Sequence, residues 1–190
     1  ANEFFDCFPI KQFQIKNNKW YEKIVNFDQK KKIFYYQNLL VKNNQLLDKL
    51  AMYNNNGIAE LSEKRESYFR KICKYVDQSS GFIIIIDYGY SDFLKHFTLQ
   101  SVFNHHLSNL FDNLGNQDIT SFVDFKKMID IAKDYNLHVE TFCNQKEFLL
   151  YSGILKRKNK IIKNCTAKQK KIIEDECYRL IDEKQMGSIF

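Results

Sequence analysis

The chain contains few residues that bend or free the backbone. Its 190 residues include a single proline, Pro9, and six glycines, at positions 57, 81, 89, 115, 153 and 187. These glycines are too far apart to form a G-x-G loop, so a glycine-rich phosphate cradle is excluded within residues 1–190.

Long apolar runs and paired cysteines are also absent. The longest apolar run, residues 81–86, is far shorter than the roughly 20 residues that a membrane span needs, and no signal-peptide pattern opens the chain. Five cysteines are odd in number, widely scattered and free of any C-x-x-C pair. We therefore expect reduced thiols in a cytosolic or matrix-like compartment, and neither a disulfide framework nor a metal site.

The composition is that of a basic globular domain. Hydrophobic residues make up 44% and aromatic residues 15% of the chain, which can supply a core, and the net charge is +6. Much of the positive charge lies at 30–32 and 156–171. Nucleic acid or anionic lipid could use such a surface. Because aromatics do not alternate with the lysines, we favour a solvated face and expect no nucleic-acid partner.

The first part of the chain predicts short strands. Residues 10–16, 19–27 and 33–36 read as a small antiparallel meander, separated by polar turns at 17–18 and 28–30. Residues 37–61 are ambiguous and are interpreted as a loop or an insertion.

The remainder, residues 62–190, predicts alternating helices and strands. Ser62 is a predicted cap for a helix that ends at residues 79–81. The run 82–86 is β-branched without polar alternation, which is typical of a strand buried on both faces of a parallel sheet. Ligands of such sheets bind beyond the carboxyl ends of the strands, which is the position of Asp87.

Further helices and a strand complete this α/β succession. Asp124 is a predicted cap for a helix to about residue 135, residues 137–142 form a predicted strand, and helical patterns return at 147–159 and after Thr166.

Several motifs, in order, resemble one family. They are Asn2-Glu3-Phe4-Phe5-Asp6 with Pro9, Ile86-Asp87-Tyr88-Gly89-Tyr90, Thr98-Leu99-Gln100 with His105, Gly115 with Asp118-Ile119-Thr120 and Val123-Asp124-Phe125, Gln145 with Glu147-Phe148-Leu149 and Gly153-Ile154, and Asp182 to Phe190 with Met186-Gly187. Together they resemble the MidA-like S-adenosylmethionine-dependent methyltransferases, which include a mitochondrial complex I assembly factor that methylates arginine.

The resemblance implies a fold and a truncation. It implies a partial Rossmann-like class I methyltransferase sheet with helices on both faces, with residues 1–190 as the C-terminal half of one domain. The glycine loop and the acidic residue that hold S-adenosyl-L-methionine lie upstream in the family, so we expect no cofactor-binding residue within this chain. The resemblance also implies a protein substrate with an acceptor arginine, in a bacterial cytoplasm or the mitochondrial matrix.

Two carboxylates are the predicted catalytic residues. An arginine side chain is a planar cation that carboxylates bind through paired hydrogen bonds, and Glu3 and Asp6 follow a strand end in the family motif. The alternative is that Asp6 caps a turn and Glu3 pairs with a surface lysine.

Six further residues are candidates for substrate binding, each with a structural alternative. They are Asn2, Asp87, Tyr88, Tyr90, His105 and Thr120. Asp87 could instead satisfy loop N–H groups, and Thr120 could order a loop together with Asp118. His105 and His106 diverge as neighbours, so we do not expect a metal pair. Gln145 and Glu147 could contact substrate or start the next helix.

Two functions remain open. The chain could be the substrate-facing half of an arginine methyltransferase that is active only with its N-terminal half. Alternatively, it could be a non-catalytic decayed fragment or a partner-binding remnant.

Overall fold

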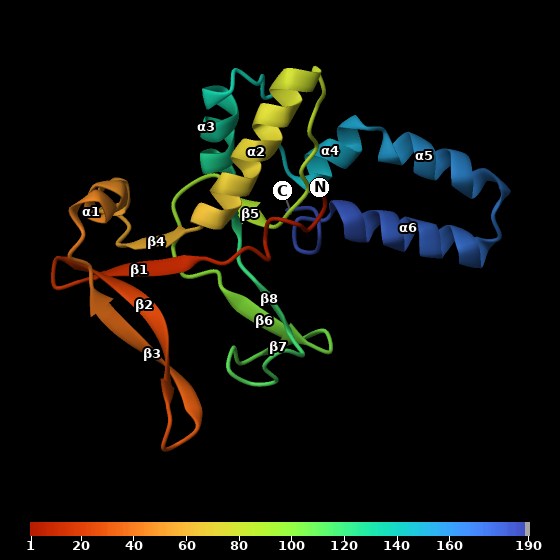
Figure 1. Ribbon diagram of the computed structural model, residues 1–190. Helices are drawn as coiled ribbons and strands as arrows, with labels where there is room; N and C mark the ends of the chain where they lie inside the picture. Colours follow the sequence, from red (N-terminus) through yellow and green to blue (C-terminus); the bar gives the residue numbers. More distant parts are fainter. Residues whose placement is uncertain (189–190) are drawn as a thin grey trace.

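The computed structural model describes residues 1–188 and has an α/β fold (Figure 1). A four-stranded antiparallel sheet of order β3-β2-β1-β4 carries the N-terminal part. Its strands are β1 Lys11–Lys16, β2 Lys19–Asp28, β3 Ile33–Leu40 and β4 Ile58–Leu61. The predicted meander is confirmed, and Asn17 and Asn18 turn the chain between β1 and β2 with positive φ angles of 49° and 57°.

Residues 37–61, interpreted as a loop or an insertion, contain regular structure and are not a loop throughout. This segment contains the end of β3, helix α1 Asn44–Leu50, the 3-10 turn η1 Ala51–Tyr53 and β4. β4 pairs with β1, and Leu50 packs with Phe13, Trp20 and Ala59 in a small core. The apolar side chains of α1 therefore complete the buried face of the sheet.

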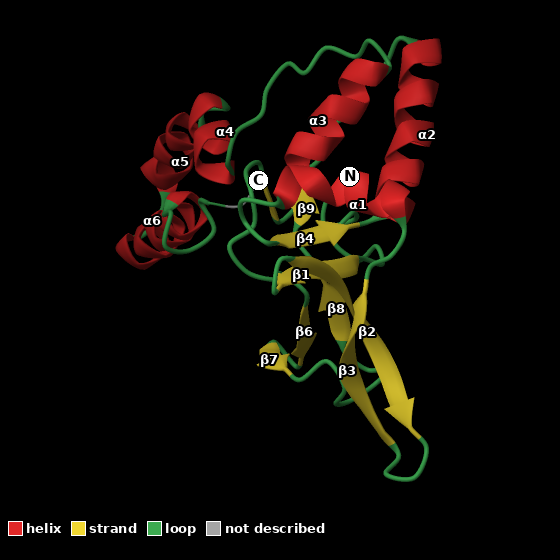
Figure 2. Cartoon of the chain, turned by 90° about the vertical axis from the view of Figure 1, so that its left-hand side faces the viewer, coloured by secondary structure: helices red, strands yellow, loops and turns green. Residues whose placement is uncertain are grey.

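Two helices cover a second core. α2 Glu63–Ser79 and α3 Phe125–Asp134 lie side by side in both views (Figures 1 and 2). Both predicted caps are confirmed, since Ser62 accepts the N–H of Arg65 and Asp124 accepts the N–H of Lys127. Phe5 and Phe69 are among the buried residues of this core, and Ile83, Ile85, Leu137 and Val139 pack against it.

The two strands predicted in this region, at residues 82–86 and 137–142, do not form as regular strands. Residues 82–86 make one parallel bridge, Asn2 to Ile86, while Phe82 is 85% and Ile84 is 53% exposed. No strand is assigned over residues 137–142. A strand needs a hydrogen-bonded neighbour along its length, and within residues 1–188 the run 82–86 has one only at residues 1–3.

Short strands connect the two cores. β5 Gly89–Tyr90 pairs in parallel with β9 Val123–Asp124. β6 Gln100–Phe103 pairs with β7 His106–Ser108 and with β8 Asp118–Thr120 in a three-stranded antiparallel sheet. Gly89 is required at the first pair, because a Cβ there would lie 2.4 Å from the Val123 carbonyl oxygen.

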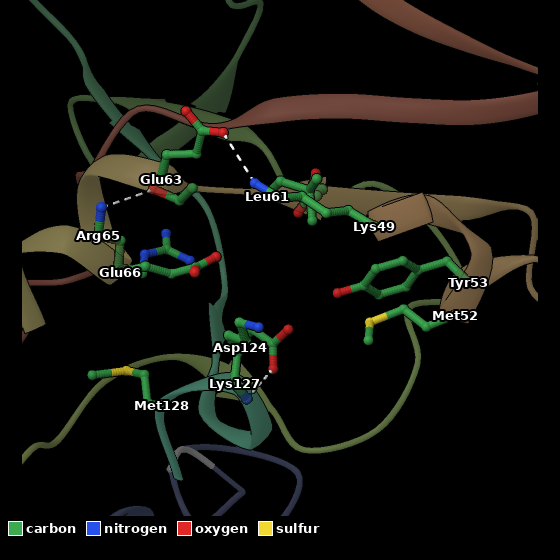
Figure 3. A pocket seen from close by; sticks show the side chains of 12 residues that line it. Lys49, Met52, Tyr53, Leu61, Glu63, Arg65, Glu66, Asp124, Lys127 and Met128 are labelled. Atoms are coloured by element: carbon green, nitrogen blue, oxygen red, sulfur yellow. Dashed lines mark hydrogen bonds and ion pairs between the residues drawn. The ribbon is translucent and has the colours of Figure 1, made fainter. Parts of the chain in front are cut away.

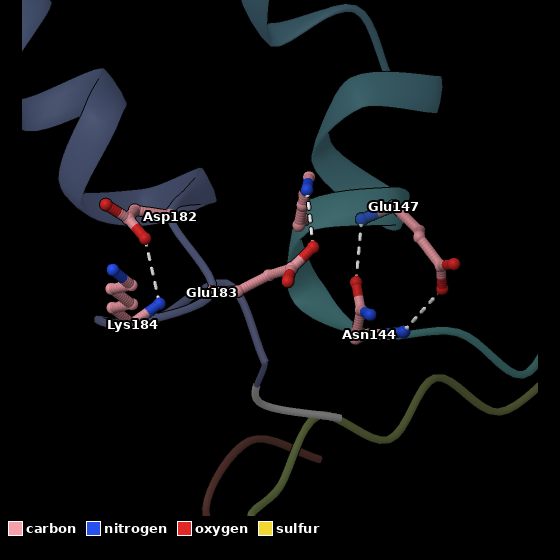
Figure 4. Close-up of polar contacts among 6 residues, drawn as sticks. Asn144, Glu147, Asp182, Glu183 and Lys184 are labelled. Atoms are coloured by element: carbon pink, nitrogen blue, oxygen red, sulfur yellow. Dashed lines mark hydrogen bonds and ion pairs between the residues drawn. The ribbon is translucent and has the colours of Figure 1, made fainter.

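The last part of the chain is a helical arm. It consists of α4 Gln145–Tyr151, α5 Ile154–Ile161, η2 Ile162–Asn164 and α6 Ala167–Ile181. Asn144 and Glu147 form a capping box at the start of α4 (Figure 4). The Lys146 ammonium pairs with Glu183 at 2.5 Å, which fixes α4 beside the segment that follows α6. No helix among residues 1–188 is long and apolar enough to cross a membrane.

Candidate functional site

Asp87 holds the N-terminal loop in place. Its side chain is 1% exposed, and Oδ2 accepts the backbone N–H groups of Phe4 at 3.1 Å and Phe5 at 2.9 Å. Oδ1 accepts the N–H of Tyr88 at 2.9 Å. Asp87 therefore satisfies loop N–H groups, as one of its two predicted roles requires, and substrate binding by Asp87 stays a prediction.

The loop turns sharply at Glu3. This residue has a φ of 42°, in the left-handed region that costs a non-glycine residue energy, and its N–H donates to the Ile86 carbonyl at 2.9 Å. Asn2 bridges to the same residue, and both Asn2 and Glu3 have exposed side chains. The loop thus presents Glu3 to solvent at a strained position.

Asp6 lies beside this carboxylate and is only 8% exposed. Burial, followed by the charges of Asp87 and Glu3, raises the pKa of its carboxyl above the ordinary value. The carbonyl of Asp6 accepts the N–H of Ser121 at 2.9 Å. Three carboxylates, Glu3, Asp6 and Asp87, therefore interact at one place.

Arg65 is a buried residue that the sequence analysis missed. Its guanidinium donates to the carbonyls of Phe5 at 2.8 Å and Phe122 at 2.9 Å, and to the Ser121 hydroxyl at 2.8 Å. It joins the loop to the segment before α3 and neutralises none of the three carboxylates through a direct bond. Arg65 lies four residues before Phe69 and therefore on the apolar face of α2. This spacing is the sequence feature that could have predicted its burial.

A second hydrogen-bond network lies behind this loop. Glu60 is 6% exposed and accepts the Gln12 side-chain amide at 2.7 Å, the Thr98 N–H at 3.0 Å and the Thr98 hydroxyl. The Thr98 hydroxyl oxygen in turn accepts the N–H of Phe122 at 2.9 Å. The motif that begins at Thr98 therefore has a structural role.

The two tyrosines of the motif at residues 86–90, Tyr88 and Tyr90, have different surroundings. Tyr88 is 37% exposed, and burial, then Glu3, Asp6 and Asp87, raise the pKa of its hydroxyl. Tyr90 is half-buried and pairs with Asp124 across β5 and β9. Burial, then Asp124 and Tyr53, raise the pKa of Tyr90 far above its usual range.

A pocket of about 130 Å³ opens near Asp124 (Figure 3). Tyr53, Glu66 and Lys127 contribute to its lining from η1, α2 and α3. Burial, then Asp124 and Glu66, raise the pKa of Tyr53 to about 12, so its hydroxyl remains protonated near neutral pH. Acidic and basic side chains both line this pocket, so it favours no single sign of ligand charge.

The remaining candidates lie at different positions. Thr120, at the end of β8, accepts the Gln100 amide at 3.5 Å and directly precedes Ser121, which binds Asp6. His105 is exposed in the turn between β6 and β7, with a φ of 63°. The structure thus brings together Asn2, Glu3, Asp6, Asp87 and Tyr88, with Thr120 adjacent, while His105 lies in a separate turn.

Neither metal ligands nor glycines are clustered among the described residues. Within residues 1–188 no three His, Cys, Asp or Glu side chains are grouped to hold a metal ion. The glycines of this part of the chain are isolated from one another in the sequence. What the loop does offer is an exposed carboxylate beside a buried one, an arrangement suited to a planar cation.

Known proteins are similar to this chain in sequence and in fold. The family model for S-adenosyl-L-methionine-dependent methyltransferases matches residues 1–143. The protein arginine methyltransferase NDUFAF7 homolog, mitochondrial, of Caenorhabditis elegans is 24% identical over 186 residues, which are 95% of this chain and 43% of that protein. The Danio rerio protein arginine methyltransferase NDUFAF7, mitochondrial, is 24% identical over 194 residues, covering 100% of this chain and 45% of its own length.

A solved structure has the same fold. A COG1565 superfamily member from Burkholderia thailandensis, bound to S-adenosyl-homocysteine, superposes with a TM-score of 0.83 at 21% identity. The match covers 99% of this chain and 50% of that one. The chain therefore spans about half the length of the relatives that it matches.

Proposed function

The chain belongs to the family of S-adenosyl-L-methionine-dependent methyltransferases, and from this premise we propose that it forms the acceptor side of a protein-arginine methyltransferase. The observation that carries the proposal is the loop at residues 2–6, which Asp87 holds with Glu3 exposed and Asp6 buried. The names of the relatives support arginine as the acceptor. Those relatives are named as mitochondrial, and we propose the mitochondrial matrix or a bacterial cytoplasm as the location, either of which fits the free thiols among the described residues.

The two carboxylates divide the work on the acceptor. Glu3 accepts N–H hydrogen bonds from the incoming guanidinium and orients one nitrogen for attack. Asp6, whose carboxyl pKa is raised by burial, takes the proton that this nitrogen gives up. Tyr88, which interacts with the charges of Glu3 and Asp6, contributes an aromatic side chain to the same site.

The cofactor supplies an electrophilic methyl group when it is bound. The residues of this chain do not include a glycine cradle for it. We propose that its binding residues belong to the portion of the family fold that residues 1–190 do not cover. The family resemblance suggests that the methylated protein substrate takes part in complex I assembly.

Methyl transfer in a completed domain tests the proposal. Residues 1–190 are co-expressed with the part of the Danio rerio relative that they do not match, and peptides incubated with S-adenosyl-L-methionine are analysed by mass spectrometry. We expect methylated arginine, with kcat/KM lowered about 100-fold by Glu3→Gln. Glu140→Gln, at an exposed position outside the loop, is the control and should leave the rate unchanged.

Two results would contradict the proposal. One is methylation of a residue other than arginine, and the other is an unchanged rate for Glu3→Gln. Calorimetry of residues 1–190 alone should show no binding of S-adenosyl-L-methionine, and tight binding would overturn the assignment of its site to other residues.

A partner-binding remnant without activity is the second candidate. The exposure of Phe82 and Ile84 favours it, because large apolar side chains on an extended segment are suited to pairing with another chain. Loss of methyl transfer in every arrangement, together with stable association of the two halves, would favour this candidate.

A further inference from the structure

The helical arm ends far from the proposed acceptor loop. α5 and α6 run side by side away from the body and meet at η2, and the chain's N-terminus lies at the other end of the arm (Figure 1). Figure 2 shows the same separation from a second direction. We refer to residues 155–172 as the distal end.

The distal end carries charge of one sign. The chain has no Asp or Glu from Ser152 to Ile173. The basic residues of this stretch are Lys156, Arg157, Lys158, Lys160, Lys163, Lys168, Lys170 and Lys171. Among the described ion pairs only Lys170 has an acidic partner here, Glu174 at 4.0 Å. The other cations are therefore available to an external anion.

Large aliphatic side chains lie among these cations. Leu155 is 41%, Ile161 is 43% and Ile172 is 53% exposed. By contrast, Ile173 and Cys177 occupy the less exposed side of α6. A purely solvated face would not need apolar groups at these positions.

We propose that the distal end binds the surface of an anionic phospholipid bilayer. Lysines near such a surface are attracted by its negative potential, and aliphatic side chains gain free energy by entering the headgroup region. The interaction is peripheral, because no described helix can span a bilayer. It revises the expectation of a merely solvated lysine face at residues 156–171.

The composition of the distal end favours lipid over nucleic acid. Single-stranded nucleic acids are bound through base stacking on aromatic rings, and residues 152–173 contain no Phe, Tyr or Trp. Leu155, Ile161 and Ile172 would also stay exposed to water against a phosphate backbone. Membrane attachment at this end leaves the loop at residues 2–6 uncovered, since the arm separates the two.

Vesicle sedimentation tests the proposal on the full chain. Vesicles contain phosphatidylcholine alone or phosphatidylcholine mixed with phosphatidylglycerol, and bound protein is measured in the pellet. We expect binding to the mixed vesicles only, and weaker binding as sodium chloride is added. Equal binding to both vesicle types, or none to either, overturns the proposal.

A lysine variant and a matched control test the contribution of charge at the distal end. Lys156→Glu/Lys160→Glu/Lys163→Glu should lower the partition coefficient at least about 100-fold. Lys64→Glu/Lys71→Glu/Lys74→Glu, on exposed positions of α2, changes the net charge equally and should have a much smaller effect. Similar losses for both triple variants would show a general charge effect and overturn the distal site.

The apolar variant distinguishes lipid from nucleic acid. Leu155→Ser/Ile161→Ser/Ile172→Ser should weaken vesicle binding about tenfold, because aliphatic area no longer enters the bilayer. If a single-stranded RNA oligonucleotide binds more tightly than the mixed vesicles, and the serine variant binds vesicles unchanged, the proposal is wrong. Circular dichroism of each variant checks that the arm remains helical, and the salt dependence of the wild-type chain remains decisive if one variant unfolds.

Discussion

The carboxylate of Asp87 accepts the backbone N–H of Phe5 at 2.9 Å and so joins segments 82 residues apart in the chain. The same side chain also accepts the N–H groups of Phe4 and Tyr88. One buried side chain therefore holds two of the motifs that carry the family resemblance, at residues 2–6 and 86–90. The proposed acceptor site depends on this relationship.

Asp87→Asn should destabilise the chain by about 2–3 kcal/mol. The substitution removes the charge from three backbone hydrogen bonds and turns an amide NH2 toward an N–H donor. Urea denaturation followed by circular dichroism measures the loss. Asp92→Asn is the matched control, because Asp92 is exposed and binds only the adjacent Phe93 N–H. A loss of stability no larger than that of the control would show that Asp87 does not hold the loop at residues 2–6 in place.

Arg65→Lys should cost about 2–4 kcal/mol of unfolding free energy. A lysine cannot reproduce the planar fork, so carbonyl oxygens of Phe5 and Phe122 lose their donors in a buried place. Thermal and urea denaturation should both show the effect. Arg70→Lys, at the exposed pair with Asp134, should change stability by less than about 0.5 kcal/mol.

Gly89→Ala should destabilise the chain by at least about 2 kcal/mol. The new Cβ would lie 2.4 Å from the Val123 carbonyl oxygen and 2.5 Å from the Phe125 ring, so β5 and β9 would have to separate. Gly81→Ala is the control, since its Cβ would meet nothing closer than the Ser79 hydroxyl at 3.8 Å. Similar stabilities for the two variants would show that the strands separate without cost.

The Asp6→Asn variant should become more stable to unfolding, relative to the wild-type chain, as pH rises. The pKa of Asp6 is raised in the folded state, first by burial and then by Asp87 and Glu3. Its ionisation therefore opposes folding, with no effect below the ordinary pKa of 3.8 and the full effect above the raised value.

Denaturation from about pH 4 to about pH 7 measures this effect. The unfolding free energy of the wild-type chain, relative to Asp6→Asn, should fall over this range. Asp77→Asn, on the exposed surface of α2, is the comparison. A constant difference between the wild-type chain and Asp6→Asn would contradict the shift.

Helices α2, α3, α4 and α6 were predictable because their signals are local, whereas α1 was missed. Ser62, Asp124 and Thr166 each cap the helix expected after them, and Glu147 belongs to the capping box of α4. A cap depends on the next three residues, so the sequence contains all the information that it requires.

The strands were harder because a ladder depends on a distant partner. The run 82–86 has the composition of a buried strand, yet its regular pairing requires neighbours beyond Asn2 and Glu3. Conversely, the sequence of β4 gives a weak strand signal, with only four residues and little periodicity. This strand forms because β1 lies beside it and pairs with it.

The candidate site was predictable in part. The motif placed Glu3, Asp6 and Asp87 together, and the structure brings them together. It did not reveal Arg65, because the bonds of this side chain go to carbonyls and a hydroxyl that only the fold brings near. The catalytic and binding roles of the candidates stay predictions.

The Thr98 hydroxyl has a consequence for how the chain opens. It lies between Glu60 of β4 and the Phe122 N–H, immediately before β6 on one side and β9 on the other. Elements of all three small sheets therefore share one chain of bonds, and the loss of Thr98 leaves the buried Glu60 carboxylate with fewer hydrogen-bond donors. Amide hydrogens of the three sheets should consequently exchange with solvent at a common rate, through one cooperative opening.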